Sequence, residues 1–340
     1  MTIRQNGGRR MAQRASHARS AAIAIAAAIA AGVGVSAQTS VNGHVNVVVD
    51  SAVLATAINH SSALVLATAF ALVTGAFPRA RATLRSQQVR LRPWWFLGGL
   101  MGFVGVLIVI SVTPVLGVVV VGVAVTLGQL AGSVIADSGG LGPGGRRPLT
   151  AFRAIGIVVA IAAIAVGAIG RIALDNVWLV PLIVLSGALI AIQQAANAWL
   201  VVVTGEFSVM SVINFSVTLV FVLIALLISA STSDIDFAAI PYWAPLGGVL
   251  GAVIGVVSAL TVRTVGVLSV MLCVAAGQAL GGIVLDLVVP VDRVGLTAAS
   301  VCSAVLAVLA VTIASLHAGP RASRRRGRRS LAPALPQEAH

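Results

Sequence analysis

The sequence predicts an all-α polytopic membrane protein, with ten transmembrane helices arranged as two inverted five-helix repeats. Of its 340 residues, 59% are hydrophobic and only 9% are charged, whereas soluble proteins carry about 25% charged residues. The apolar residues also form long continuous runs. A membrane-spanning helix needs about 20 apolar residues, so this composition supplies about ten of them. A soluble enzyme, a nucleic-acid-binding domain and a disordered chain are all excluded.

Each apolar run is expected to be a helix, because its apolar residues are continuous and do not alternate with polar ones as in barrel strands. The connectors Thr113-Pro114 and Arg263-Thr264 are expected to divide the two longest runs into hairpins. The predicted helices cover 20–38, 52–77, 94–112, 115–136, 152–170, 178–200, 207–230, 243–262, 265–287 and 294–316.

The arginines predict the orientation of the chain, since basic residues collect in the short cytoplasmic loops of membrane proteins. Ten spans with a cytoplasmic N-terminus place all but Arg171 and Arg293 of the 22 basic residues inside. Most carboxylates then fall on the opposite side. We therefore expect a bacterial inner membrane protein with both termini in the cytoplasm.

The first apolar segment allows a second interpretation. Basic residues, an Ala-rich stretch and Val35-Ser36-Ala37 also match a cleavable signal peptide. Charge counting does not separate the two interpretations, because removal of this segment leaves the remaining topology intact. An internal repeat favours retention of the segment as the first helix.

The repeat is visible in polar residues and glycines that recur in the same order in both halves. An offset of 155 residues relates Gln38 to Gln193, Asn42 to Asn197 and Asn59 to Asn214. An offset of 149 relates Gly98-Gly99 to Gly247-Gly248, Gly102 to Gly251, Gly117 to Gly266, Gly128-Gln129 to Gly277-Gln278, and Asp137 to Asp286.

Five helices in each repeat, an odd number, require the second half to be inverted relative to the first. The connector 78–93 contains five arginines, whereas its counterpart 231–242 contains none and carries Asp234 and Asp236. Inverted repeats are typical of transporters that work by alternating access. The predicted division is a basic N-terminal tail at 1–19, repeats at 20–171 and 178–317, and an Arg-rich C-terminal tail at 318–340.

Several motifs resemble one transporter family. They are the Pro93-Trp94-Trp95 entrance before Gly98-Gly99, the hairpin that ends in Gly128-Gln129 and then Asp137, the downstream Arg146-Arg147-Pro148, and the Q-x-x-x-N pattern in each half. Over about 22–318 the chain resembles the YdcZ-like branch of the drug/metabolite transporter superfamily, which is related to EamA-like exporters. The resemblance implies ten spans, an inner membrane location and the export of small metabolites or drugs.

Uncharged amides are the candidate substrate-binding groups, because polar side chains within spans usually face the bundle interior. Gln38 and Asn42 lie four residues apart, on one helix face, as do Gln193 and Asn197. Gln129 and Gln278 are secondary candidates. These amides either contact a polar, neutral or zwitterionic substrate or hold helices together.

The small residues Gly98, Gly102, Gly247 and Gly251 are interpreted as helix-packing positions. No catalytic residue, metal site or cofactor is expected, and an intramembrane enzyme is disfavoured because the spans offer no nucleophile paired with a base. The remaining alternative is a non-transporting scaffold or assembly protein. The two Arg-rich tails are expected to contact anionic lipids, and no nucleic acid.

Overall fold

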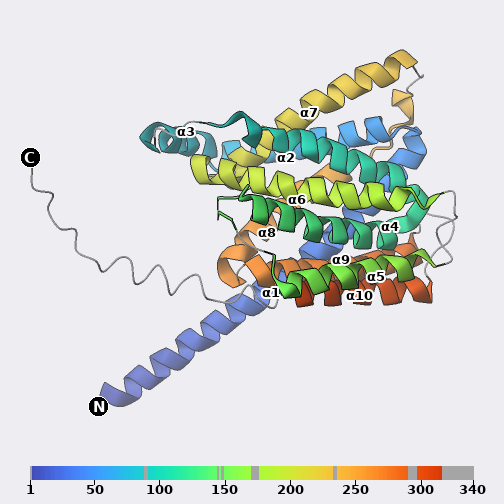
Figure 1. Cartoon of the computed structure of the whole chain (residues 1–340). Coiled ribbons are helices and arrows are strands. Elements are labelled where there is room, and N and C mark those ends of the chain that lie inside the picture. Colours follow the sequence, from blue (N-terminus) through green and yellow to red (C-terminus); the bar gives the residue numbers. More distant parts are fainter. Residues whose placement is uncertain are drawn as a thin grey trace, which may run out of the picture.

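The computed structural model describes residues 2–87, 91–143, 145–146, 149–169, 176–232, 236–265, 267–289 and 297–315. Among them every regular element is a helix, and Figure 1 shows these helices packed side by side in one bundle. The α-helices are α1 (Thr2–Val49), α2 (Ala52–Val73), α3 (Ala76–Gln87), α4 (Leu97–Gly139), α5 (Ala151–Ala168), α6 (Leu179–Thr204), α7 (Phe207–Thr232), α8 (Leu246–Val265), α9 (Val267–Val288) and α10 (Ala298–Ser315). The predicted all-α class is confirmed.

The long helix α4 is two antiparallel passes through the bundle. Gly105 packs against Ser186 and Ile190 of α6, while Gly132 packs against Ala188, between those two positions. A straight helix would separate residues 105 and 132 by about 40 Å. The chain therefore turns back between them, at Gly117, whose backbone has a φ of +74° and a ψ of 165°.

The two hairpin turns lie a few residues beyond their predicted positions. Pro114 stays inside α4, and the reversal occurs at Gly117, because a positive φ is readily adopted only by glycine. In the second half, α8 continues through Arg263 and Thr264 to Val265, and α9 starts at Val267. Gly266, the counterpart of Gly117, lies outside the described residues.

Two helical segments differ from the prediction. The first helix is not confined to 20–38: α1 extends from Thr2 to Val49, so it includes the expected N-terminal tail and all of Gln38–Asn42. The expected loop after residue 77 begins with the amphipathic helix α3, AFPRARATLRSQ. The C-terminal tail at 318–340 and the arginines Arg171 and Arg293 lie outside the described residues.

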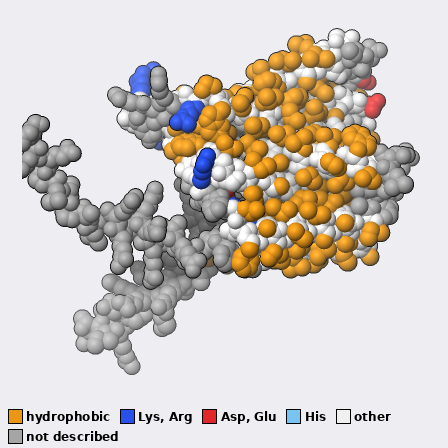
Figure 2. Space-filling view, in the orientation of Figure 1, with side chains coloured by type: hydrophobic (Ala, Val, Ile, Leu, Met, Phe, Trp, Pro, Cys, Tyr) orange, Lys and Arg blue, Asp and Glu red, His pale blue; other side chains and the backbone are white. Residues whose placement is uncertain are grey.

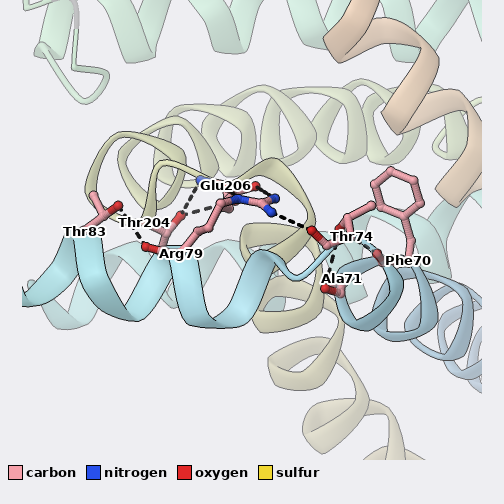
Figure 3. A network of polar contacts seen from close by, with 7 residues as sticks. All are labelled: Phe70, Ala71, Thr74, Arg79, Thr83, Thr204 and Glu206. Atoms are coloured by element: carbon pink, nitrogen blue, oxygen red, sulfur yellow. Dashed lines mark hydrogen bonds and ion pairs between the residues drawn. The ribbon is translucent and has the colours of Figure 1, made fainter.

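Helix α3 is attached to the bundle by an ion pair. The Arg79 guanidinium donates to Glu206, in the connector between α6 and α7, at 2.6 Å, and to the Thr74 carbonyl at 2.5 Å, as Figure 3 shows. The hydrogen bond to Glu206 raises the pKa of Arg79 above its ordinary value. The pair is partly exposed, and it fixes α3 beside the start of α7.

The exterior is that of a membrane protein. In the part of the chain that the structure describes, five helical segments are long and apolar enough to cross a bilayer, namely Arg19–Val49, Ala52–Val73, Pro93–Gly139, Leu179–Thr204 and Phe207–Ser231, and four shorter apolar helices accompany them. Figure 2 shows hydrophobic side chains over most of the visible face. On this face, basic side chains gather at the end that carries α3, and carboxylates lie at the opposite end.

The two halves are related by an approximate twofold axis. Helices α2 and α7 are repeat counterparts and pack against each other. Their equivalent residues His60 and Phe215 touch, with ring centroids 6.2 Å apart in an edge-to-face arrangement. Equivalent residues that meet must lie beside the axis that relates them.

The packing of the glycine-rich helices shows that the axis inverts one half. Gly98, at the start of α4, lies at Asn197 and Asn214, near the bundle end that carries α3. Gly247, at the start of α8, lies at Asn42 and Asn59, near the other end of α2. The equivalent helices therefore begin at opposite ends of the bundle.

Candidate substrate site

Three amides of the first half form a buried cluster, which we call the first amide triad: Gln38 and Asn42 of α1 and Asn59 of α2. The Asn42 Nδ2 donates to Asn59 Oδ1 at 3.0 Å, and Gln38 Nε2 donates to the same oxygen at 3.4 Å. Asn42 and Asn59 are buried, and Gln38 is partly buried. All three therefore face the bundle interior.

The first triad packs directly on the glycine face of α8, from the other half. A Cβ at Gly247 would collide with Asn42 Oδ1, and one at Gly251 would lie 2.6 Å from Gln38 Nε2. A Cβ at Gly248, between them, would collide with the Asn59 carbonyl. Glycine is required here because any side chain would push α8 away from the amides.

The second amide triad consists of the repeat counterparts Gln193 and Asn197 of α6 and Asn214 of α7. It packs on the glycine face of α4: a Cβ at Gly98 would lie 3.1 Å from Asn197 Oδ1, and one at Gly102 would lie 2.5 Å from Gln193 Nε2. Each triad therefore contacts a glycine helix from the opposite half. The candidate substrate-binding amides therefore pack directly against the candidate packing glycines, in one contact between α8 and the first triad and another between α4 and the second triad.

The hydrogen bonding of the two triads differs. In the second triad Gln193 Nε2 donates to Asn214 Oδ1 at 3.2 Å, as Gln38 does to Asn59. Asn42 Nδ2 also donates to Asn59 Oδ1, but among the described residues the equivalent bond from Asn197 to Asn214 is missing, and the buried Asn197 Oδ1 has no hydrogen-bond partner. The repeat symmetry is broken at this one amide.

The second triad lines a large cavity. Its volume is about 710 Å³, and its walls come from α2, α6, α7 and α8. Gln193, Gln194, Asn197 and Asn214 contribute amides, and Ser208, Ser211 and Ser258 contribute hydroxyls. Phe70, Phe207 and Phe215 contribute aromatic rings. The cavity lies at the bundle end that carries α3, since Phe207 follows Glu206, the partner of Arg79.

The equivalent space at the other end of the bundle is packed. Ala52, Ala55 and Val106 are the repeat counterparts of Phe207, Met210 and Gly255, which line the cavity. Here they belong to an apolar cluster, the closed-end cluster, whose fully buried members are Val45, Val49, Leu54, Ala55, Ile110 and Ala244. The bundle is therefore hollow at one end and filled at the other.

The secondary candidates Gln129 and Gln278 lie apart from both triads. The Gln129 backbone packs on Gly187 of α6, and the Gln278 carbonyl accepts a hydrogen bond from Ser36 Oγ at 2.6 Å. Gln278 lines a separate cavity of only about 20 Å³. The structure thus divides four of the six predicted amides between two triads, which Asn59 and Asn214 complete, and only Gln193 and Asn197 of these four line the large cavity. The other two predicted amides lie elsewhere.

The buried carboxylate of Asp286 caps the start of the second pass of α4. Asp286 of α9 is 1% exposed and accepts hydrogen bonds from the backbone N–H groups of Val118 and Val119, at 3.1 and 3.3 Å. These N–H groups start the second pass of α4, where helical partners are missing. Within the described part of the chain, no cluster of three or more His, Cys, Asp or Glu side chains could hold a metal ion.

Comparison with known proteins agrees with this architecture. The model of the family described as "Putative inner membrane exporter, YdcZ", of the drug/metabolite transporter type, matches residues 23–166 and 178–313. The two matched segments fit two repeats. No curated protein matches the chain. Since the family model covers most of the sequence and the fold is a bundle of two inverted repeats, the chain belongs to this family of inner membrane transporters.

Proposed function

We propose that the protein is a secondary transporter that exports small metabolites or drugs by alternating access between its two repeats. One observation carries the proposal: a cavity of about 710 Å³ at one end of the bundle corresponds, by the repeat symmetry, to the closed-end cluster at the other. In a transporter with inverted repeats, exchanging the conformations of the halves opens the opposite side. The same sequence can therefore present the site to either face of the membrane.

The proposed orientation has the cavity open to the cytoplasm. The cavity lies beside α3, which carries Arg79, Arg81 and Arg85, and basic residues mark cytoplasmic loops. The opposite end carries Asp50 and Asp236. A cavity that faces the cytoplasm is the loading state of an exporter. Both termini are proposed to be cytoplasmic, with the basic tails contacting anionic lipids.

The glycine contacts supply surfaces on which the halves can move. The amides of each half rest on the backbone of α4 or α8 from the other half, without large side chains between them. We propose that α8 closes over Phe207 and Met210 as the first pass of α4 leaves Ala52 and Ala55. Gly255 already faces the Phe207 ring, where a Cβ would lie 3.3 Å from Cζ.

Export can be tested by filling the cavity. Ser211 lies in its wall and is half-buried. Cells that produce wild-type protein, Ser211→Trp or Ser211→Ala at equal membrane levels would be compared by metabolite profiling of the medium. We expect a set of small solutes to leave faster with the wild type and with Ser211→Ala than with Ser211→Trp, because only tryptophan places a bulky side chain in the cavity.

The same comparison separates transport from the scaffold alternative. If no solute distinguishes the three strains, the proposed export is wrong. A scaffold role would then account better for the chain, since such a role does not depend on an empty cavity.

A further inference from the structure

The repeat symmetry of the two triads is broken at Asn197. Asn197 is 6% exposed, lines the large cavity, and has an Oδ1 with no hydrogen-bond partner among the described residues. Leaving a buried acceptor unpaired is energetically unfavourable. Its counterpart Asn42, at the packed end, donates from Nδ2 to Asn59 Oδ1 at 3.0 Å, whereas among the described residues Asn197 makes no equivalent bond to Asn214. Among the buried amide oxygens of the described residues, that of Asn197 is the one that lacks a hydrogen-bond partner, and Asn197 lies beside the cavity.

A hydrogen-bond donor on a solute would satisfy this oxygen. The terminal torsion of asparagine has broad energy wells, so the amide can rotate toward the cavity that its side chain already lines. Gln193 and Asn214 are bonded to each other, and both also line the cavity. Asn197 is bonded to neither of them among the described residues, so its Oδ1, which is buried against Gly98 of α4, can turn toward a solute without breaking a hydrogen bond.

The other residues that line the cavity indicate the chemistry of the rest of the solute. Phe70 of α2 and Phe207 and Phe215 of α7 provide apolar surface in the cavity wall. The described lining residues carry no charged side chain, and a charge taken from water into such a site would lack a partner. An uncharged head with an apolar body fits both features.

We infer that the cavity binds uncharged amphipathic solutes, which donate an N–H or O–H group to Asn197 and place an apolar body against Phe70, Phe207 and Phe215. This inference rests on the proposed function, because it names the class of solute carried by the same site. It requires the solute to carry a hydrogen-bond donor, since polarity alone is not sufficient.

Four probes with one apolar body and different heads test the inference. They are 4-phenylbutyramide, its N,N-dimethylamide, 4-phenylbutyrate and 4-phenylbutylammonium, which present respectively a neutral donor, a neutral acceptor, an anion and a cation. Binding to the full-length protein in nanodiscs would be measured by equilibrium dialysis, with empty nanodiscs to subtract partition into lipid. Ser211→Trp, which places a bulky indole in the cavity, shows whether binding occurs there.

The primary amide should bind about tenfold more tightly than each of the other three probes. Asn197→Ala should remove its advantage over the dimethylamide. Asn197→Asp should make the ammonium the preferred probe, because a carboxylate then faces the solute. The control Ser186→Ala changes a buried residue on the same helix, bonded to the Ile183 carbonyl and outside the cavity lining, and should keep the wild-type order.

Three results would overturn the inference: equal binding of the primary amide and the dimethylamide, an unchanged preference in Asn197→Ala, or no cavity binding by any probe. None of these results decides whether the protein exports solutes. That question depends on the Ser211→Trp comparison in cells, so the solute class and the function can fail separately.

Discussion

At the scale of single residues, the two asparagines at equivalent positions should differ in what they contribute to stability. Asn42→Ala removes a buried hydrogen bond to Asn59, and we expect a loss of about 1 kcal/mol in the free energy of unfolding. Asn197→Ala should cost less, because its Oδ1 has no described partner to lose. Equilibrium unfolding in SDS mixed micelles measures both. Equal losses would show that the difference in hydrogen bonding between the two triads does not affect the free energy of unfolding.

The glycines beneath the triads give a second prediction at this scale. Alanine normally stabilises a helix relative to glycine, but Gly247→Ala places a methyl group against the buried Asn42 amide. We expect a loss of about 1–3 kcal/mol in the free energy of unfolding, as for other overpacked sites. Gly142→Ala is the matched control, since a Cβ there meets nothing within 4 Å. If both variants unfold alike, the contact between α8 and the first triad is not tight.

At the scale of elements, the second pass of α4 depends on Asp286. Asp286→Ala leaves the Val118 and Val119 N–H groups without this acceptor inside the bundle. We expect a loss of about 2 kcal/mol or more, while Asp286→Asn, which keeps one acceptor oxygen, should lose less. Unfolding of both variants in SDS mixed micelles would show the difference. A loss of stability that is the same for alanine and asparagine would contradict the capping role.

The elements also show what sequence patterns can and cannot specify. Apolar length predicts the class and the approximate position of each span. The hairpin turn was expected at Thr113-Pro114, but a proline can remain in a helix, whereas the positive φ at residue 117 needs glycine. Helix α3 was missed because an arginine-rich connector of twelve residues resembles a loop unless its amphipathic spacing is considered.

The candidate site was predictable only in part. Spacing and repetition indicate that Gln38, Asn42, Gln193 and Asn197 face inward. Their packing on glycines of the opposite half could not be predicted, because it depends on contacts between segments that are far apart in the sequence. No local sequence pattern encodes such contacts. The matched offsets of the amides and glycines were the only sequence signal that pointed to this packing. The unpaired Oδ1 of Asn197 has no signal in the sequence, because its counterpart Asn42 is the same residue type.

At the scale of the whole molecule, the inverted repeats predict opposite locations for equivalent connectors. Reporter domains inserted after Gln87 and after Thr232 should report cytoplasm and periplasm respectively, because the first connector is basic and the second carries Asp236. A reporter at the C-terminus should also be cytoplasmic. Location of the two connectors on one side of the membrane would contradict the inversion.

Alternating access is the central claim, and distances at the two ends of the bundle test it most directly. Spin labels at Val73 and Leu260 would report on α2 and α8 at the cavity end. Their repeat counterparts, Ile228 and Ser111, would report on α7 and α4 at the closed end, and all four positions are exposed. Cys273 and Cys302 would first be replaced, since both are free cysteines.

Pulsed electron–electron double resonance in nanodiscs would be recorded for each pair, with and without 4-phenylbutyramide. The account predicts two distances for each pair, in complementary proportions: the fraction of molecules that is open at the cavity end equals the fraction that is closed at the other. Any shift in these fractions should be opposite in sign at the two ends. A single unchanged distance for both pairs, or lengthening of both together, would contradict alternating access.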